Sequence, residues 1–115
     1  MERIFIICAS LLGFLGVGLG AFGAHGLPAY FAQKYAAEPG RPEKMMATWE
    51  VAVRYQLYHA LALLGVAWFC SQWPSGAATA SGWCMIGGVC IFSGTLFLLT
   101  LSDLRWLGAI TPLGG

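Results

Sequence analysis

Apolar residues fill three long blocks of the chain, and polar residues and prolines gather between them. A helix that crosses a bilayer needs about 20 mostly apolar residues, and each block approaches that length. The pattern predicts membrane-spanning helices over residues 4–24, 52–73 and 83–101, and the start of a fourth over residues 106–115. Because this last segment is too short to span, we expect the fourth helix to be truncated in this chain.

Two connectors with different chemistry separate the three predicted spans. The first, residues 27–51, is charged and interrupted by prolines, and we expect a helix from Glu43 to run directly into the second span. Glu50 and Arg54 have the i, i+4 spacing that predicts an ion pair on one helix face. The second connector, residues 74–82, is small, polar and without charge.

Composition supports a membrane protein. Of the 115 residues, 58% are hydrophobic and 10% are charged, whereas soluble domains average about 25% charged residues. No charged residue occurs between Arg54 and Asp103, whereas a water-exposed surface would require several in a stretch of this length. The net charge of +1, without a basic run, does not favour nucleic acid as a partner. We therefore predict one integral membrane domain over residues 1–115, an all-α polytopic transmembrane bundle whose partner is the lipid bilayer.

The distribution of lysine and arginine predicts an orientation. Five of these residues lie in or beside the first and third connectors, and Arg3 lies at the other end with the amino terminus. The five are Lys34, Arg41, Lys44, Arg54 and Arg105. Cytoplasmic loops carry the excess of positive charge, so we expect both connectors in the cytoplasm and the protein in the bacterial inner membrane.

The first predicted span carries a stripe of small residues. Ala9, Gly13, Gly16, Gly20 and Gly23 recur at alternating spacings of four and three, which places them on one side of a helix. Small residues at this spacing let two helix backbones approach closely in lipid. We therefore interpret the stripe as a helix-packing face.

Two other interpretations of this segment exist. Residues 18–23 spell GxGxxG, but the dinucleotide-binding fingerprint needs a preceding strand and a following helix, and here it lies inside an apolar run of membrane length. Arg3, the apolar stretch and the small residues at 21–23 also resemble a secretory signal peptide. The apolar part is long for such a signal and glycine-rich throughout, so packing is the favoured interpretation.

Polar residues near the ends of the predicted spans form the candidate functional cluster. Since the first two spans are antiparallel and joined by the first connector, these residues are all expected toward the same, cytoplasmic, membrane face. The set is His25, Glu50, Arg54, Tyr55, Gln56, His59, Asp103, Arg105 and Thr111. One interpretation is structural, in which these groups satisfy one another and cap helix ends. The alternatives are axial haem ligation by two histidines, a metal site with a carboxylate, or a proton or solute pathway.

Three motifs in order resemble the YgdD-like family of small membrane proteins of unknown function, known in bacteria and with animal relatives. They are GAFGAHGL at residues 20–27, WEVAVRYQLYHA at 49–60 and WLGAITPLGG at 106–115. The resemblance covers nearly the whole chain and implies a four-helix inner-membrane protein whose fourth span continues beyond the third motif. It implies no catalytic or ligand residues.

Two hypotheses about function follow. The first is a structural or accessory membrane component that acts through helix packing, with itself or in a larger complex. The second is a small-solute or proton-coupled transporter that uses His25, Arg54 and His59. No nucleophile-base-acid order, carboxylate pair or phosphate loop is present, so we expect neither enzymatic activity nor a cofactor.

Overall fold

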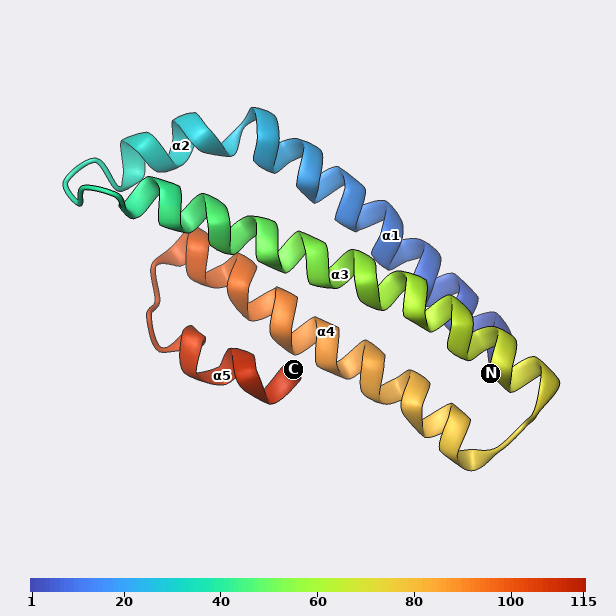
Figure 1. The fold of residues 1–115 in the computed structure, drawn as a ribbon. Coiled ribbons are helices and arrows are strands. Elements are labelled where there is room, and N and C mark those ends of the chain that lie inside the picture. The colour runs from blue at the N-terminus through green and yellow to red at the C-terminus, as the bar shows by residue number, and fades with distance from the viewer.

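The computed structural model describes residues 1–115, and its regular structure is entirely helical (Figure 1). The five helices are α1 Glu2–His25, α2 Leu27–Lys34, α3 Arg41–Gln72, α4 Gly76–Ser102 and α5 Leu107–Gly114. Two of them, α1 and α4, are long and apolar enough to cross a membrane. The all-helical expectation is therefore confirmed, with two candidate spans.

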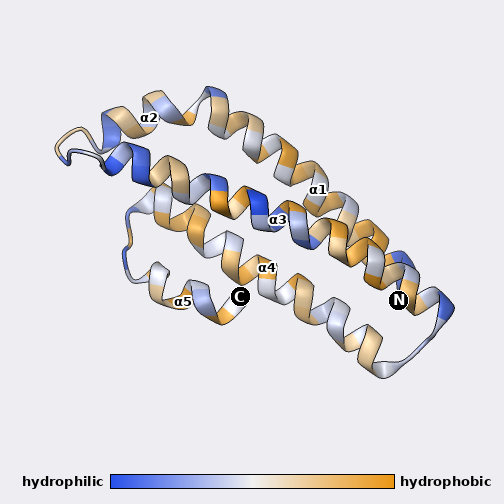
Figure 2. Cartoon of the chain, viewed as in Figure 1, coloured by the Kyte–Doolittle hydropathy of each residue, from blue (hydrophilic) through white to orange (hydrophobic).

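The helices form a long, thin body that measures 54 × 27 × 15 Å along its principal axes. Helix α3 lies between α1 and α4 and packs on both, while α5 folds back along α4 (Figure 1). The α2–α3 and α4–α5 connections lie at the same end of the body. Figure 2 shows hydrophilic residues concentrated at that end and in a band within α3, and apolar residues along most of α1.

Helix α1 has 24 residues, a length of about 36 Å at 1.5 Å per residue. It ends where Gly26 and Pro28 follow, since proline has no amide hydrogen for the helix ladder. The Gly26 amide still donates to the Phe22 carbonyl at 2.8 Å, which closes the last turn. Pro28 then occupies the first turn of α2, where a missing amide hydrogen costs little.

The first connector is more helical than expected. Residues 27–51 contain α2 and the first turns of α3, and a short turn around residues 35–40 is the only break. Gly40 has φ +77°, a left-handed conformation that glycine adopts without strain, and it precedes the start of α3 at Arg41. The expectation of a helix that runs into the second apolar block is confirmed, and it begins two residues before Glu43.

The second connector is shorter than the predicted residues 74–82, because α4 already begins at Gly76. The Ser75 hydroxyl accepts a hydrogen bond from the Ala78 amide at 3.1 Å and caps the helix. Three alanines follow within the first turns, and alanine has the highest helix propensity. A capped helix start therefore explains most of these small, uncharged residues better than a connector does.

The second predicted span, residues 52–73, lies in α3 up to Gln72, and Trp73 follows the end of the helix. Helix α3 is not one of the two helices that meet the length and composition requirement. Arg54, Gln56 and His59 interrupt its apolar character. The fourth predicted segment, residues 106–115, corresponds to α5, which carries Pro112 within its eight residues.

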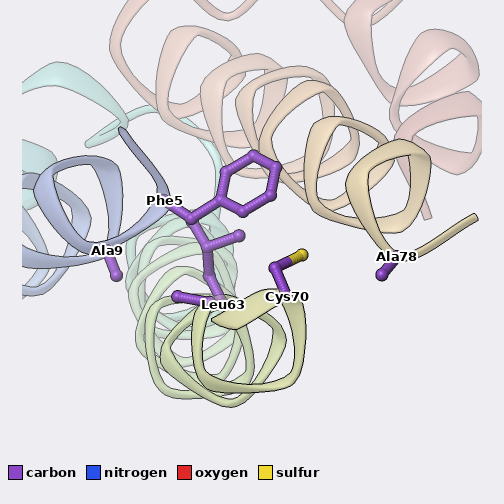
Figure 3. Packing of buried hydrophobic residues seen from close by; sticks show 6 residues of the cluster. Phe5, Ala9, Leu63, Cys70 and Ala78 are labelled. Atoms are coloured by element: carbon purple, nitrogen blue, oxygen red, sulfur yellow. The ribbon is translucent and has the colours of Figure 1, made fainter. Parts of the chain in front are cut away.

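Two separate cores hold the helices together at opposite ends of the body. The apolar-end core, shown in Figure 3, consists of Phe5, Ala9, Leu63, Ala67, Cys70 and Ala78. The connector-end core consists of Leu27, Phe31, Tyr35, Met45, Trp49 and Val53. Only 23 of the 115 residues are buried, and many large apolar side chains of α1, α3 and α4 are exposed. An apolar outer surface of this extent suits contact with lipid.

Candidate functional site

The interface between α1 and α3 is built on glycines. A Cβ atom at Gly23 would lie 2.5 Å from Nε1 of Trp49, and one at Gly16 would lie 2.8 Å from Cδ2 of Leu57. Both distances are too short for real atoms, so a larger residue at either position would require the facing side chain or the helix to move. The missing side chains are what allow α3 to approach the α1 backbone.

Because the two helices lie so close, polar side chains of α3 reach backbone carbonyls of α1. Nε1 of Trp49 donates to the Leu19 carbonyl at 3.0 Å, and Nε2 of Gln56 donates to the Leu12 carbonyl at 2.9 Å. Donors and acceptors are both spaced by seven residues, so they form two rungs along one antiparallel interface. Ser93 of α4 makes a similar contact on the other side of α3, where its hydroxyl donates to the Ala52 carbonyl at 2.8 Å.

The small-residue stripe of α1 therefore faces α3 of the same chain. Ala9, Gly16 and Gly23 are buried, and a Cβ at Gly20 would lie 3.3 Å from Cγ1 of Val53. Gly13 differs from the expectation, because nothing lies within 4 Å of its Cβ position. Four of the five residues thus lie at the packed interface, and Gly13 borders open space.

A groove of about 290 Å³ runs along one side of this interface. Its lining residues are Gly20, Gly23, Ala24, Met46, Trp49, Glu50, Val53, Arg54 and Leu57. Glu50 and Arg54 are the two charged groups of the groove, and both are exposed. The predicted ion pair between them is not formed, since none of the ion pairs in the structure includes either residue.

The remaining members of the predicted polar cluster are dispersed. Nδ1 of His59 lies 2.7 Å from the Tyr55 carbonyl of its own helix, and the Tyr55 ring packs on Phe92 of α4 at 4.9 Å between centroids. The Thr111 hydroxyl is buried against Thr95 at 2.7 Å, between α4 and α5. These contacts bind each group to a different neighbour, so the cluster expected from sequence does not exist as one site.

The histidines are not brought together. His25 is exposed at the end of α1, next to Ala24 of the groove wall. Gly23 lies beside Trp49, and His59 follows Trp49 by ten residues, which is about 15 Å along a helix. No group of three or more histidine, cysteine, aspartate or glutamate side chains is close enough to hold a metal ion.

Charged residues of the two connectors meet in a network that sequence reasoning did not assemble. Glu38 Oε1 lies 3.1 Å from Nη2 of Arg105, and Glu38 Oε2 lies 3.3 Å from Nε of Arg41. Arg41 also pairs with Asp103, whose φ of +56° ends α4 in a left-handed conformation. Asp103 and Arg105 belonged to the predicted cluster, whereas their partners Glu38 and Arg41 did not. The sequence did contain a signal for this network, because the two connectors carry opposite charges and were expected at the same membrane face.

Tyr35 anchors this network to the end of α4. Its hydroxyl donates to the Thr100 carbonyl at 2.7 Å, and the Arg41 guanidinium lies 5.6 Å from the centre of its ring. The ammonium group of Lys34 donates to the neighbouring Leu101 carbonyl. Burial, together with the Asp103 charge, raises the pKa of the Tyr35 hydroxyl above its ordinary value, because both disfavour a phenolate.

Comparison with known proteins finds similar membrane proteins of unknown function. Residues 19–115 match the family described as "Protein of unknown function (DUF423)". UPF0382 membrane protein YwdK of Bacillus subtilis (strain 168) is 42% identical over 114 residues, which are 98% of this chain and 85% of that protein. UPF0382 membrane protein SH2409 of Staphylococcus haemolyticus (strain JCSC1435) is 42% identical over 113 residues, or 98% and 84% of the two chains. No solved structure matches.

Proposed function

Because this chain belongs to the DUF423 family of unknown function, and its relatives are named membrane proteins, we propose that it is a structural or accessory component of the bacterial inner membrane. It acts through helix packing and not through catalysis. The α1–α3 interface carries this proposal, since glycine contacts and hydrogen bonds to helix carbonyls are the means by which helices associate in lipid.

The proposal includes a polytopic arrangement in which α3 also lies in the membrane, between α1 and α4. Two polar side chains of α3 that would be costly in lipid, Trp49 and Gln56, donate to carbonyls of α1, which supports this placement. Helix α5 packs on the other side of the bundle, against α4. This is the four-helix arrangement implied by the resemblance to the YgdD-like family, which stays a prediction.

The first and third connectors are proposed to face the cytoplasm, where the positive-inside rule puts an excess of lysine and arginine. The proposal is tested by single cysteines at two exposed positions, Ala37→Cys and Ser75→Cys, in a chain whose native cysteines are replaced by serine or alanine. A membrane-impermeant maleimide added to intact cells should label position 75 and not position 37. Labelling at position 37 alone would reverse the orientation, and labelling at both would contradict a spanning arrangement.

The packing role is tested by two leucine substitutions on α1. Gly16→Leu should disturb the α1–α3 interface, because its Cβ already falls within 3.1 Å of two Leu57 carbons. Gly18→Leu is the matched control, since nothing lies within 4 Å of its Cβ position. The measurements are stability and co-purification in mild detergent, in which Gly16→Leu should destabilise the chain and through it lose associated proteins, while Gly18→Leu and His59→Ala should keep both. An unchanged set of partners with Gly16→Leu, or their loss with His59→Ala, would count against the proposal.

A further inference from the structure

The α1–α3 groove combines two unpaired opposite charges with apolar walls. Glu50 and Arg54 are separated by one helical turn, and neither has an ion-pair partner. Met46, Trp49 and Val53 contribute apolar surface beside them. Such a site is complementary to a small group that carries one negative and one positive charge a few ångströms apart.

The position of the groove along the helices indicates where such a group would come from. Its α1 residues lie at positions 20–24, next to the end of α1 at His25. Charged side chains are tolerated close to the end of a membrane segment, and tryptophan is enriched at the same level of the bilayer. Trp49 lies at this level, in the wall of the groove. Lipid headgroups occupy this level of the bilayer.

The surface beyond the groove, toward the middle of α1, is open and apolar. Gly13 lies seven residues before Gly20, hence on the same face of α1, and nothing fills the space at its Cβ position. Leu61 lies seven residues after Arg54 on α3 and is 69% exposed. A lipid whose headgroup sits in the groove could therefore lay an acyl chain along this part of the interface.

We propose that the α1–α3 groove binds the headgroup of a zwitterionic aminophospholipid. Arg54 contacts the phosphate, because a guanidinium donates hydrogen bonds in a geometry that matches phosphate oxygens. Glu50 accepts hydrogen bonds from the primary ammonium group. The volume of about 290 Å³ is at the small end of ligand sites, which suits a headgroup whose acyl chains remain in the bilayer. This inference rests on the membrane placement in the proposed function but not on the packing role.

The binding test uses the full chain, purified in mild detergent, and measures its melting temperature with added phosphatidylethanolamine, phosphatidylcholine or phosphatidylglycerol. Phosphatidylethanolamine should stabilise most, since the quaternary amine of phosphatidylcholine donates no hydrogen bonds and phosphatidylglycerol has no cation. Mass spectrometry should also find phosphatidylethanolamine retained above its share of the extracted lipid. Equal stabilisation by all three lipids without such enrichment would overturn the proposal.

Charge variants separate the two contacts. Arg54→Gln should weaken binding of all three lipids by roughly tenfold, since each loses a charge-assisted hydrogen bond. Glu50→Gln should remove the preference for phosphatidylethanolamine over phosphatidylglycerol and leave the phosphate contact intact. Glu43→Gln is the control, because this exposed carboxylate of α3 does not line the groove. An unchanged lipid preference in Glu50→Gln would overturn the assignment.

A leucine pair tests the groove itself. Gly20→Leu places a side chain in the groove and should abolish lipid enrichment, while Gly18→Leu, in open space on the same helix, should preserve it. Soluble phosphoethanolamine should stabilise far less than the lipid, and equal stabilisation would overturn the lipid assignment.

The oligomeric state provides the last distinction. The lipid proposal would be overturned if the purified chain were a dimer without bound lipid and if Glu50→Gln and Arg54→Gln dissociated that dimer. This face of the protein would then be the contact with a second copy of the chain. Before these experiments, cells that express the wild-type chain are separated into membrane and soluble fractions. Recovery of the chain in the soluble fraction would contradict the proposed function as well as the lipid site. Membrane recovery without lipid enrichment would reject the headgroup site alone.

Discussion

The two ends of the molecule are held together by different chemistry. At the apolar end, Phe5 is fully buried against Gly82 of α4, and the surrounding core contains no charged group. At the connector end, Tyr35 and Trp49 belong to an aromatic core, but their polar atoms bond to the backbone of neighbouring helices and ion pairs lie beside them. One end depends on shape, and the other depends on hydrogen bonds and charge as well.

The difference follows from the environment of each end. Within lipid, burial of apolar surface supplies no drive for two helices to associate, so close fit and hydrogen bonds must do so. Near water, exposed ion pairs contribute little because solvent and salt screen them. Variants that alter one end should therefore differ from variants of the other in both the size of their effect and its dependence on salt.

The largest effect is expected from Gly82→Leu at the apolar end. A Cβ atom there would lie within 2.8 Å of three ring atoms of Phe5, so Phe5 or the helix must move. Overpacking of this kind costs about 3 kcal/mol at its upper end. Reversible unfolding in micelles measures it, with Gly87→Leu as the control because that position is open. Equal stability of the two variants would show that shape does not hold this end.

A smaller effect, which salt should reduce, is expected from Asp103→Asn at the connector end. Asparagine tolerates the left-handed conformation of this residue, so the substitution removes the charge opposite Arg41 and little else. The expected loss is about 1 kcal/mol at low salt. Glu43→Gln removes a carboxylate that has no ion pair and only the weaker attraction of the α3 N-terminus, so it should cost less than Asp103→Asn. A loss that persists in high salt would indicate a structural and not an electrostatic role.

The hydrogen bond of Trp49 should contribute less still. Trp49→Phe keeps an aromatic ring against Phe97 but removes the donor to the Leu19 carbonyl. Hydrogen bonds between membrane helices average about 0.6 kcal/mol, and a loss of that size is expected in the same unfolding measurement. Trp83→Phe is the comparison variant, because Trp83 packs on Phe5 without a side-chain hydrogen bond, although it is 45% exposed and Trp49 is 3% exposed. If both variants lost the same stability, ring packing would explain the result and the hydrogen bond would not.

The smallest effect is the pH dependence that Tyr35 confers. Its pKa is raised in the folded chain, so above pH 10 the unfolded chain releases this proton first. Stability should therefore be unaffected by this group below pH 10 and should fall as the pH rises beyond it. Tyr35→Phe should remove that part of the alkaline slope while the effect of Gly82→Leu stays independent of pH. An identical slope in Tyr35→Phe would assign the alkaline sensitivity to other groups.

Much of the fold was predictable, because helices of membrane length leave a strong pattern in sequence. The limits of α1, the helix that leads into the second apolar block and the close packing of Gly16 and Gly23 followed from apolar runs and seven-residue spacing. The predicted loop at residues 74–82 was wrong, since small polar residues and alanine suit a capped helix start as well as a loop.

The candidate site was less predictable, because rotation of one helix against another decides which side chains meet. His25, Arg54 and His59 share the polar character of a site, yet His59 bonds within its own helix and Arg54 lies in the α1–α3 groove. Glu38 and Arg41 appeared to be ordinary connector charges until Asp103 and Arg105 came beside them.

The sequence by itself determined that the chain is helical, apolar and rich in close-packing glycine, because hydropathy and residue size are properties of each position. The tertiary structure decided that the glycines of α1 face α3, that Gly13 is left open and that Glu50 and Arg54 line a groove without pairing. Those outcomes depend on how three helices rotate and cross, and that geometry is set by the sum of many contacts between residues distant in the chain.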